Sequence, residues 1–161
     1  MNNELITQYA QIWRVFDRLV NDFDAAAWLS TGRKAITPAR LSWHILQSAR
    51  YYLQDRDAVT FPSGKPFDGK WDTAAEADLP SKDDIRRCAK DYRRKTEAWL
   101  AQMDLSAPNT AFPWAGESQL GVAIFVLKHM TYHMGELSSL LNEAQGGNSA
   151  DNYVIANEEK D

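Results

Sequence analysis

The chain has 161 residues, of which 44% are hydrophobic and 25% charged, a composition typical of one globular domain with a sizeable core. Its formal charge of −4 argues against a nucleic-acid-binding protein, because such proteins carry a basic face or stripe. The single cysteine excludes an intrachain disulfide framework, and neither a secretory pattern nor a long apolar run is found, so we expect a cytoplasmic protein without a membrane span.

Two helices are predicted in the first part of the chain. Apolar residues recur every three to four positions from Asn3 to Asn21, and the Asn3 side chain can cap the first turn. The second predicted helix runs from Pro38 to about Arg56. Thr37 supplies an N-cap hydroxyl to it, and Pro38 takes the first helical position, where no amide hydrogen bond is lost.

Two further helices follow a long connection. Residues 57–80 are rich in proline and glycine and predict a loop, which is long enough to run back along the bundle and let its flanking helices point the same way. The third helix is predicted from Lys82 to Met103, with a capping box made by Ser81 and Asp84. The fourth is predicted from residue 117 or 118 to residue 145, where a Gly-Gly pair stops it.

The predicted fold is an all-α four-helix bundle that covers residues 1–147. No internal repeat and no convincing pair of strands is found in the sequence. Residues 148–161 form a polar tail, in which Tyr153, Val154 and Ile155 could attach to the bundle surface. An apolar stripe on the first or fourth helix could form a dimer face, because the sequence does not separate inner from outer stripes.

All three histidines fall on predicted core faces. At about 100° per residue, His129 and His133 lie one turn apart on one face of the fourth helix, in line with Val126 and Leu137. His44 lies among apolar residues of the second helix. Two imidazoles spaced i, i+4 and a third from a facing helix can form a metal site in a bundle. We therefore predict a divalent ion, zinc or nickel, held by these histidines, with positions left for water or substrate.

A reading without a metal stays open. The three histidines could instead be buried and hydrogen-bonded to hydroxyls such as Ser48 or Thr96, or to backbone carbonyls, because an unpartnered buried polar group costs about 1–3 kcal/mol. Glu136 returns to the face of His129 and is a candidate fourth ligand, hydrogen-bond acceptor behind a ligand, or general base, unless it only reaches solvent. Gly135 beside it would allow a neighbouring helix to come close.

The chain resembles the DinB-like proteins, also called the DinB/YfiT superfamily, in the order and spacing of four residues. They are His44 in LSWHILQSARYYL, and His129, His133 and Gly135 in KHMTYHMGEL. The resemblance covers nearly the whole chain and implies an up-down-down-up bundle with a long crossover between the second and third helices. It also implies a divalent metal held by the three histidines, a homodimer, and transfer or isomerisation reactions with low-molecular-weight thiols.

Two functions are expected from these features. The first is a metal-dependent enzyme that activates a water or a small thiol, of the thiol-transferase or hydrolase type, with Glu136 accepting a proton; this glutamate stands where the family commonly has glutamine. Cys88 lies on an apolar stripe and is expected to be buried and inert. The second is a non-catalytic, stress-related metal-binding protein. In both, Phe112, Pro113 and Trp114 are expected near the approach to the site.

Overall fold

The computed structural model describes residues 2–32 and 36–158 and is helical over 66% of the chain. These residues form no strand, only two isolated bridges. The four long helices are α1 (Asn2–Asp22), α3 (Pro38–Tyr52), α4 (Lys82–Gln102) and α5 (Gln119–Ala144). Short helices and turns complete the chain: α2 (Ala25–Ser30), α6 (Asn152–Glu158), and two 3-10 turns, η1 (Glu76–Asp78) and η2 (Pro113–Ala115). The predicted all-helical bundle is confirmed at this level.

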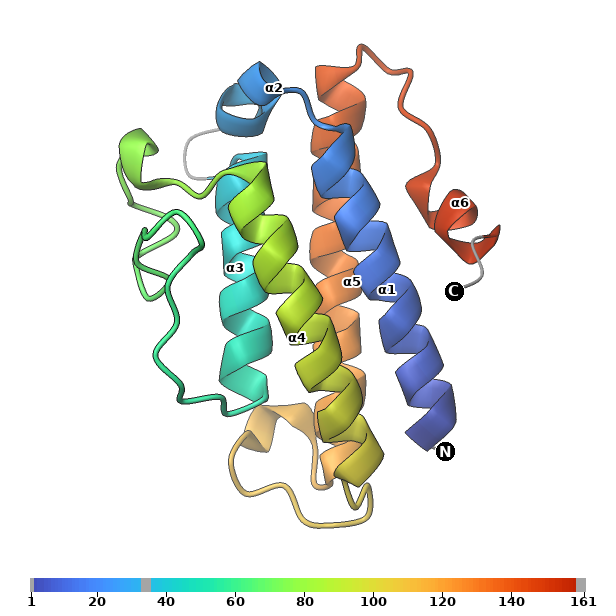
Figure 1. Cartoon of the computed structure of the whole chain (residues 1–161). Coiled ribbons are helices and arrows are strands. Elements are labelled where there is room, and N and C mark those ends of the chain that lie inside the picture. Colours follow the sequence, from blue (N-terminus) through green and yellow to red (C-terminus); the bar gives the residue numbers. More distant parts are fainter. Residues whose placement is uncertain (1, 33–35, 159–161) are drawn as a thin grey trace.

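The long helices pack side by side around one apolar core (Figure 1). Both α1 and α3 pack against α4 and α5, while α6 lies on the outer side of α1 and α2 beside α3. Burial of large aromatic side chains dominates the core, since Tyr9, Phe16 and Trp43 are each at most 1% exposed. None of the described helices combines the length and the apolar character needed to cross a membrane.

The predicted caps of two helices are confirmed. The Thr37 hydroxyl accepts a hydrogen bond from the Arg40 amide at the start of α3. Ser81 and Asp84 form a full capping box at the start of α4, with the Ser81 amide donating to the Asp84 carboxylate at 3.0 Å. The other oxygen of Asp84 accepts from the Ser63 amide at 2.9 Å, so this carboxylate also fixes the preceding connection to α4.

Other helix ends differ from the predictions. The first helix begins at Asn2, so Asn3 lies inside it and is not the cap; the Asn2 amide nitrogen instead donates to two carbonyls at the end of α4. The α3 helix ends at Tyr52 and not near Arg56, because Gln54 takes a positive φ of 53° that ends the helical path. At the start of α5, Ser118 caps the first turn, one of the two predicted positions.

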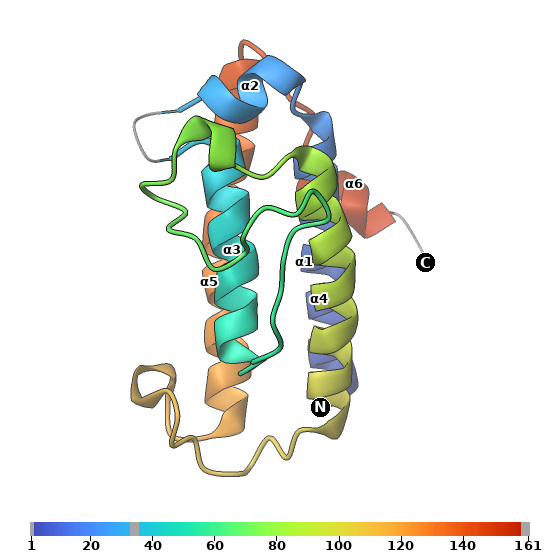
Figure 2. The same ribbon diagram turned by 60° about the vertical axis from the view of Figure 1, so that its left-hand side comes forward.

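The crossover between α3 and α4 runs along the bundle beside both helices (Figure 2). It is packed, because its aromatic residues Phe61 and Phe67 are at most 1% exposed. The Trp43 indole and the Gln47 amide of α3 both donate to the Phe67 carbonyl, at 2.8 and 2.6 Å. It turns at Gly64, which has a φ of +84° and open space where a side chain would lie. The crossover is therefore held to the helix that carries His44.

Two short helices were not predicted. The Asp24 side chain caps α2 by accepting from the Ala27 amide at 2.7 Å. In α6, the buried Asn152 donates to the Asp22 carboxylate at 3.1 Å and accepts from Arg18 at 3.3 Å. Of the apolar residues predicted to attach the tail, Tyr153 and Val154 are 52% and 49% exposed, while Ile155 is half-buried; Ala156, which follows them, is buried in the core.

Candidate metal centre

The bundle brings the three predicted ligands together at the seam between α3 and α5. His44 lies near the middle of α3, and His129 and His133 lie one turn apart on α5. The Nε2 atom of His133 is 3.2 Å from that of His44 and 3.1 Å from that of His129. One ring nitrogen from each residue lies within 4.8 Å of the others. Residues separated by more than eighty positions in sequence thus point their ring nitrogens at one place.

These separations fit a small divalent ion. Two nitrogens held tetrahedrally at 2.0–2.1 Å from zinc lie roughly 3.3 Å apart, close to the two observed Nε2 separations. The three histidines are also the one group of potential metal ligands that the described part of the chain assembles. Three neutral nitrogen donors suit zinc or nickel better than calcium or magnesium, which prefer oxygen.

Glu136 supports one of the rings from behind. Its Oε2 atom is 2.6 Å from Nδ1 of His133. A carboxylate only accepts hydrogen bonds, so Nδ1 carries the proton and the lone pair of a neutral ring lies on Nε2, toward the other two histidines. This geometry suits an acceptor behind a ligand, the second of the three roles considered for Glu136. The His129 ring has no such support, because its Nδ1 is buried without a partner among the described residues.

Among the described residues, neither hydroxyl named in the reading without a metal bonds to a histidine ring. Thr96 donates to the Tyr92 carbonyl at 2.7 Å, and Ser48 makes no hydrogen bond to any of the rings. If no metal is bound and Nδ1 of His133 carries the proton, Nε2 of His133 has a single lone pair. That lone pair would have to accept hydrogen bonds from both His44 and His129 at once. A cation at the point of convergence would receive all three lone pairs, so the donor set fits a metal ion better.

The rings lie less deep than predicted. All three histidines are half-buried at the α3–α5 seam and not enclosed in the core, whose wall here is made by Met130 and Met134 on the neighbouring positions of α5. Gly135 does not admit a neighbouring helix, because nothing lies within 4 Å of where its side chain would be. The site therefore combines protection on one side with an outlet to the surface.

Partial burial keeps the rings of His44 and His129 neutral. Desolvation, reinforced by His133 and His129, lowers the pKa of His44 to about 4. Desolvation and His133 also lower the pKa of His129, against an opposite effect of Glu136. At neutral pH these two imidazoles are uncharged and can present lone pairs, as a metal ligand must.

Aromatic rings surround the three histidines. Trp71, from the crossover, lies 4.5 Å from the His44 ring, and Tyr132 meets the His133 ring edge-on at 5.1 Å. Trp71 was not among the predicted site residues, because its position depends on how the crossover packs. Phe125 and Tyr52 lie 6.4 and 6.3 Å from the His129 ring. These are distances between ring centroids, and we call the four aromatic residues the aromatic collar of the site.

The predicted approach segment is near this collar. Phe112 packs on Tyr52 with ring centroids 5.0 Å apart, and Trp114 donates to the Tyr52 hydroxyl at 3.4 Å. Trp114 is 57% exposed, so this end of the collar opens to solvent. Pro113 starts the short turn η2 that places both aromatic residues. The three residues of this segment therefore reach the collar through Tyr52, and none of them contacts a histidine ring directly.

Cys88 takes no part in the site. It lies on α4, is 8% exposed, and makes no disulfide. Burial, and to a lesser degree two nearby aspartates, raise the pKa of its thiol to about 11, so it stays protonated at neutral pH. The expectation of a buried thiol is confirmed.

No family profile, no curated protein and no solved structure matches the chain.

Proposed function

We propose that the protein is a DinB-like, divalent-metal-binding enzyme whose ion is held by His44, His129 and His133. The observation that carries the proposal is the convergence of three ring nitrogens, with Nε2 of His133 lying 3.2 Å from that of His44 and 3.1 Å from that of His129. The up-down-down-up topology belongs to the same proposal. Its support is the course of the chain in Figures 1 and 2, where α3 and α4 begin at the end of the bundle at which α2 lies.

The proposed reaction is transfer of a small thiol or hydrolysis. A divalent ion in this position would lower the pKa of a water or thiol and so supply a nucleophile at neutral pH. Glu136 holds the proton on Nδ1 of His133 and thereby orients that ring, and in this proposal it also receives the proton released by the nucleophile. The aromatic collar limits the access of bulk water and would contact the apolar part of a small-molecule substrate. Zinc or nickel, a cytoplasmic location and a homodimer complete the proposal.

A non-catalytic metal-binding protein is the second candidate. The observation that favours it is the composition of the collar, which is aromatic and offers few polar groups besides Glu136 to orient a substrate. This candidate shares the metal site with the first and differs only in the absence of turnover.

Metal analysis of the untagged protein tests the site. We expect about one zinc or nickel ion per chain in the wild type and nearly none in His129→Ala or His44→Ala. Lys128→Ala, an exposed neighbour of His129 on the same helix, is the matched control and should keep the ion. Equal metal content in all four proteins would contradict the site.

Activity assays separate the two candidates. The metal-loaded protein is assayed for transfer of several small thiols and for hydrolysis of activated esters and amides. We expect turnover that is lost in His129→Ala. Full metal occupancy without any turnover would contradict the enzyme and leave the binding protein.

A further inference from the structure

A second site is indicated on a different face of the bundle. A cavity of about 460 Å³ lies between α1 and α4, within the size range of small-molecule pockets. Basic side chains dominate its lining: Arg14, Arg18, Arg86, Arg87, Lys90 and Arg93. Against these six, the lining has two acidic residues, and Glu97 pairs with Arg93 at 3.0 Å, so basic groups exceed these carboxylates by three in a chain whose net charge is −4.

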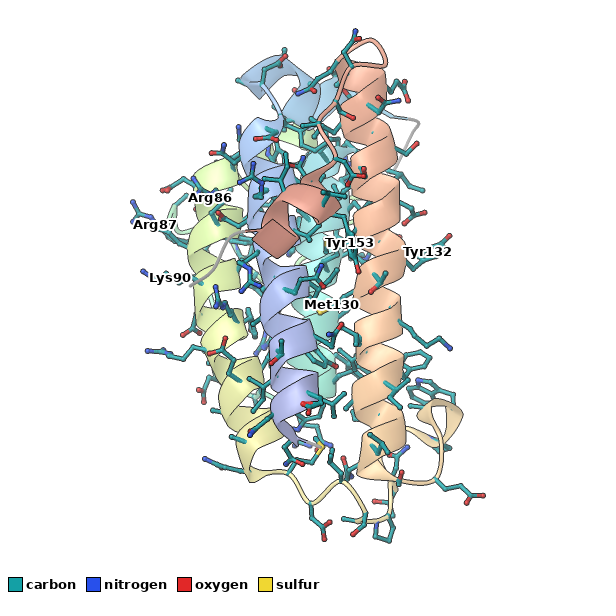
Figure 3. All side chains as sticks on the ribbon, turned by 90° about the vertical axis from the view of Figure 1, so that its right-hand side faces the viewer. Arg86, Arg87, Lys90, Met130, Tyr132 and Tyr153 are labelled. Carbon is teal, nitrogen blue, oxygen red and sulfur yellow. The ribbon has the colours of Figure 1, made fainter. Side chains whose placement is uncertain are left out.

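Helical spacing places these basic side chains on shared faces of α1 and α4. Arg86 and Lys90 are four residues apart on α4 and share one face, and Arg93 follows three residues later. Arg14 and Arg18 form the corresponding i, i+4 pair on α1, where they also bind α6 through the Ala156 carbonyl and the Asn152 side chain. Figure 3 shows Arg86, Arg87 and Lys90 projecting together from one side of α4.

The acidic residues of the cavity hold their arginines through exposed ion pairs. Asp17 accepts two hydrogen bonds from Arg86, at 2.8 and 3.0 Å, and these side chains are 47% and 44% exposed. Arg87 and Asp83 are even more exposed and 3.0 Å apart. Such pairs contribute little to stability, and a ligand with higher charge density can take over the guanidinium groups. Lys90 is exposed and has no carboxylate partner among the described residues.

The cavity wall offers donors in excess of acceptors. Six of its lining residues carry guanidinium or ammonium groups, which can only donate, and two carry carboxylates. A ligand that matches this wall must supply acceptor oxygens and negative charge together. Phosphoryl groups do both, and the planar guanidinium fork binds two of their oxygens at once.

We propose that the α1–α4 cavity binds a small soluble molecule carrying one or more phosphoryl groups. The site is separate from the histidine cluster, since no histidine lines the cavity. It would give the protein a second ligand whose binding does not need the metal. Because basic residues and acceptor-rich ligands attract through exposed charges, binding should weaken strongly as salt rises.

Pyrophosphate is the probe for this proposal. It is titrated into the full chain at low ionic strength while amide chemical shifts are followed by NMR, which locates the response as well as its strength. We expect shifts centred on α1 and α4. Arg87→Gln with Lys90→Gln should weaken binding about tenfold, a loss of roughly 1.4 kcal/mol. The two side chains are exposed, so the fold should be retained.

The matched control removes one arginine and one lysine elsewhere. Arg56→Gln with Lys70→Gln makes the same change in net charge at exposed positions outside the cavity and should bind like the wild type. An equal loss in both double variants would overturn the proposal, because binding would then follow net charge alone. No binding by the wild type, or shifts centred on His129 and His133, would overturn it as well.

A macromolecular ligand is tested in parallel. A short DNA duplex and vesicles containing an anionic phospholipid are titrated under the same conditions. Weaker binding of both than of pyrophosphate supports a small soluble ligand. If the DNA duplex or the vesicles bind more tightly than pyrophosphate, and this binding is lost in Arg87→Gln with Lys90→Gln, the proposed class of ligand is wrong. The ligand would then be the nucleic acid or the membrane surface that binds more tightly.

Discussion

The α3–α5 seam and the α1–α4 cavity both bring polar side chains together, but they differ in the burial and the charge of those side chains. Each gathers polar side chains from two helices that are distant in sequence. At the seam the groups are half-buried imidazoles close to one another, whereas in the cavity they are charged and half-buried or exposed, and Arg86 and Arg87 are paired with carboxylates. Tyr132, at the seam, and Arg87, at the cavity, project from opposite sides of the bundle in Figure 3.

This difference determines which solution condition should affect each region most. Burial moves the pKa of the imidazoles, so the properties of the seam should depend on pH and on metal. Exposed arginines keep their charge over the whole accessible pH range, so the cavity should depend on salt instead. Four predictions test this contrast, in order of decreasing effect.

Zinc should stabilise the fold through the seam alone. At a free concentration of 1,000 times Kd, a ligand of the native state raises the free energy of unfolding by about 4 kcal/mol. We expect such a rise in urea unfolding of the wild type and of Arg87→Gln, and none in His129→Ala. A similar rise in all three proteins would mean that zinc acts away from the histidines.

Acid should destabilise the metal-free protein through its histidines. The pKa of His44 is near 4 in the fold and near 6.5 when unfolded, so the unfolded chain takes up protons first as pH falls below about 6.5. We expect a loss of about 2–3 kcal/mol between pH 7 and pH 4.5 from His44 and His129 together. The pKa values of Asp55 and Asp84 are lowered, so the stability that these ionised carboxylates contribute is lost at a pH below this interval.

Urea unfolding at the two pH values, with a chelator present, measures this loss. His44→Gln should lose less stability than the wild type over the same interval, because a glutamine does not titrate. An unchanged free energy of unfolding in the wild type would contradict the assignment of buried, neutral imidazoles.

Glu136→Gln should weaken metal binding about tenfold, because removal of an acceptor behind a metal ligand typically costs ten- to a hundredfold. The neutral amide can still accept from Nδ1 of His133, so we expect the low end of that range. Competition with a chromogenic chelator measures the affinity. Glu143→Gln, an exposed position on the same helix, makes the same charge change and should leave the affinity as it is. Equal losses in both variants would show that only net charge matters.

The smallest effect is expected at the Arg86–Asp17 pair. A double-mutant cycle with Arg86→Gln and Asp17→Asn should give a coupling free energy below about 1 kcal/mol, because both side chains are exposed. The coupling should fall further in 1 M sodium chloride. A salt-independent coupling above about 2 kcal/mol would show that the pair is effectively buried and that the cavity is not open to ligands.

Local signals were predictable from the sequence. The caps at Thr37 and at Ser81 with Asp84 depend on residues within one turn, and the structure has both. The pair His129 and His133 is likewise fixed by helical geometry. Its convergence with His44 needed one further assumption, that α3 and α5 are neighbours, which the structure bears out.

Features that depend on tertiary packing were not predictable. Trp71 reaches the His44 ring only because Arg40 donates to the Trp71 and Ala74 carbonyls, at 2.8 and 2.7 Å, and so fixes the crossover. The basic cavity requires that α1 and α4, about seventy residues apart, face each other. On each helix alone, its charges are indistinguishable from a solvated face.

The turn at Gly64 makes this chain suitable for division into two pieces. Cleavage there would leave His44 in one fragment and His129 and His133 in the other. The downstream fragment would retain Phe67, whose carbonyl binds Trp43 of the upstream one. Neither fragment alone contains a complete set of imidazoles, so capture of zinc by the mixture would report that the halves have recombined.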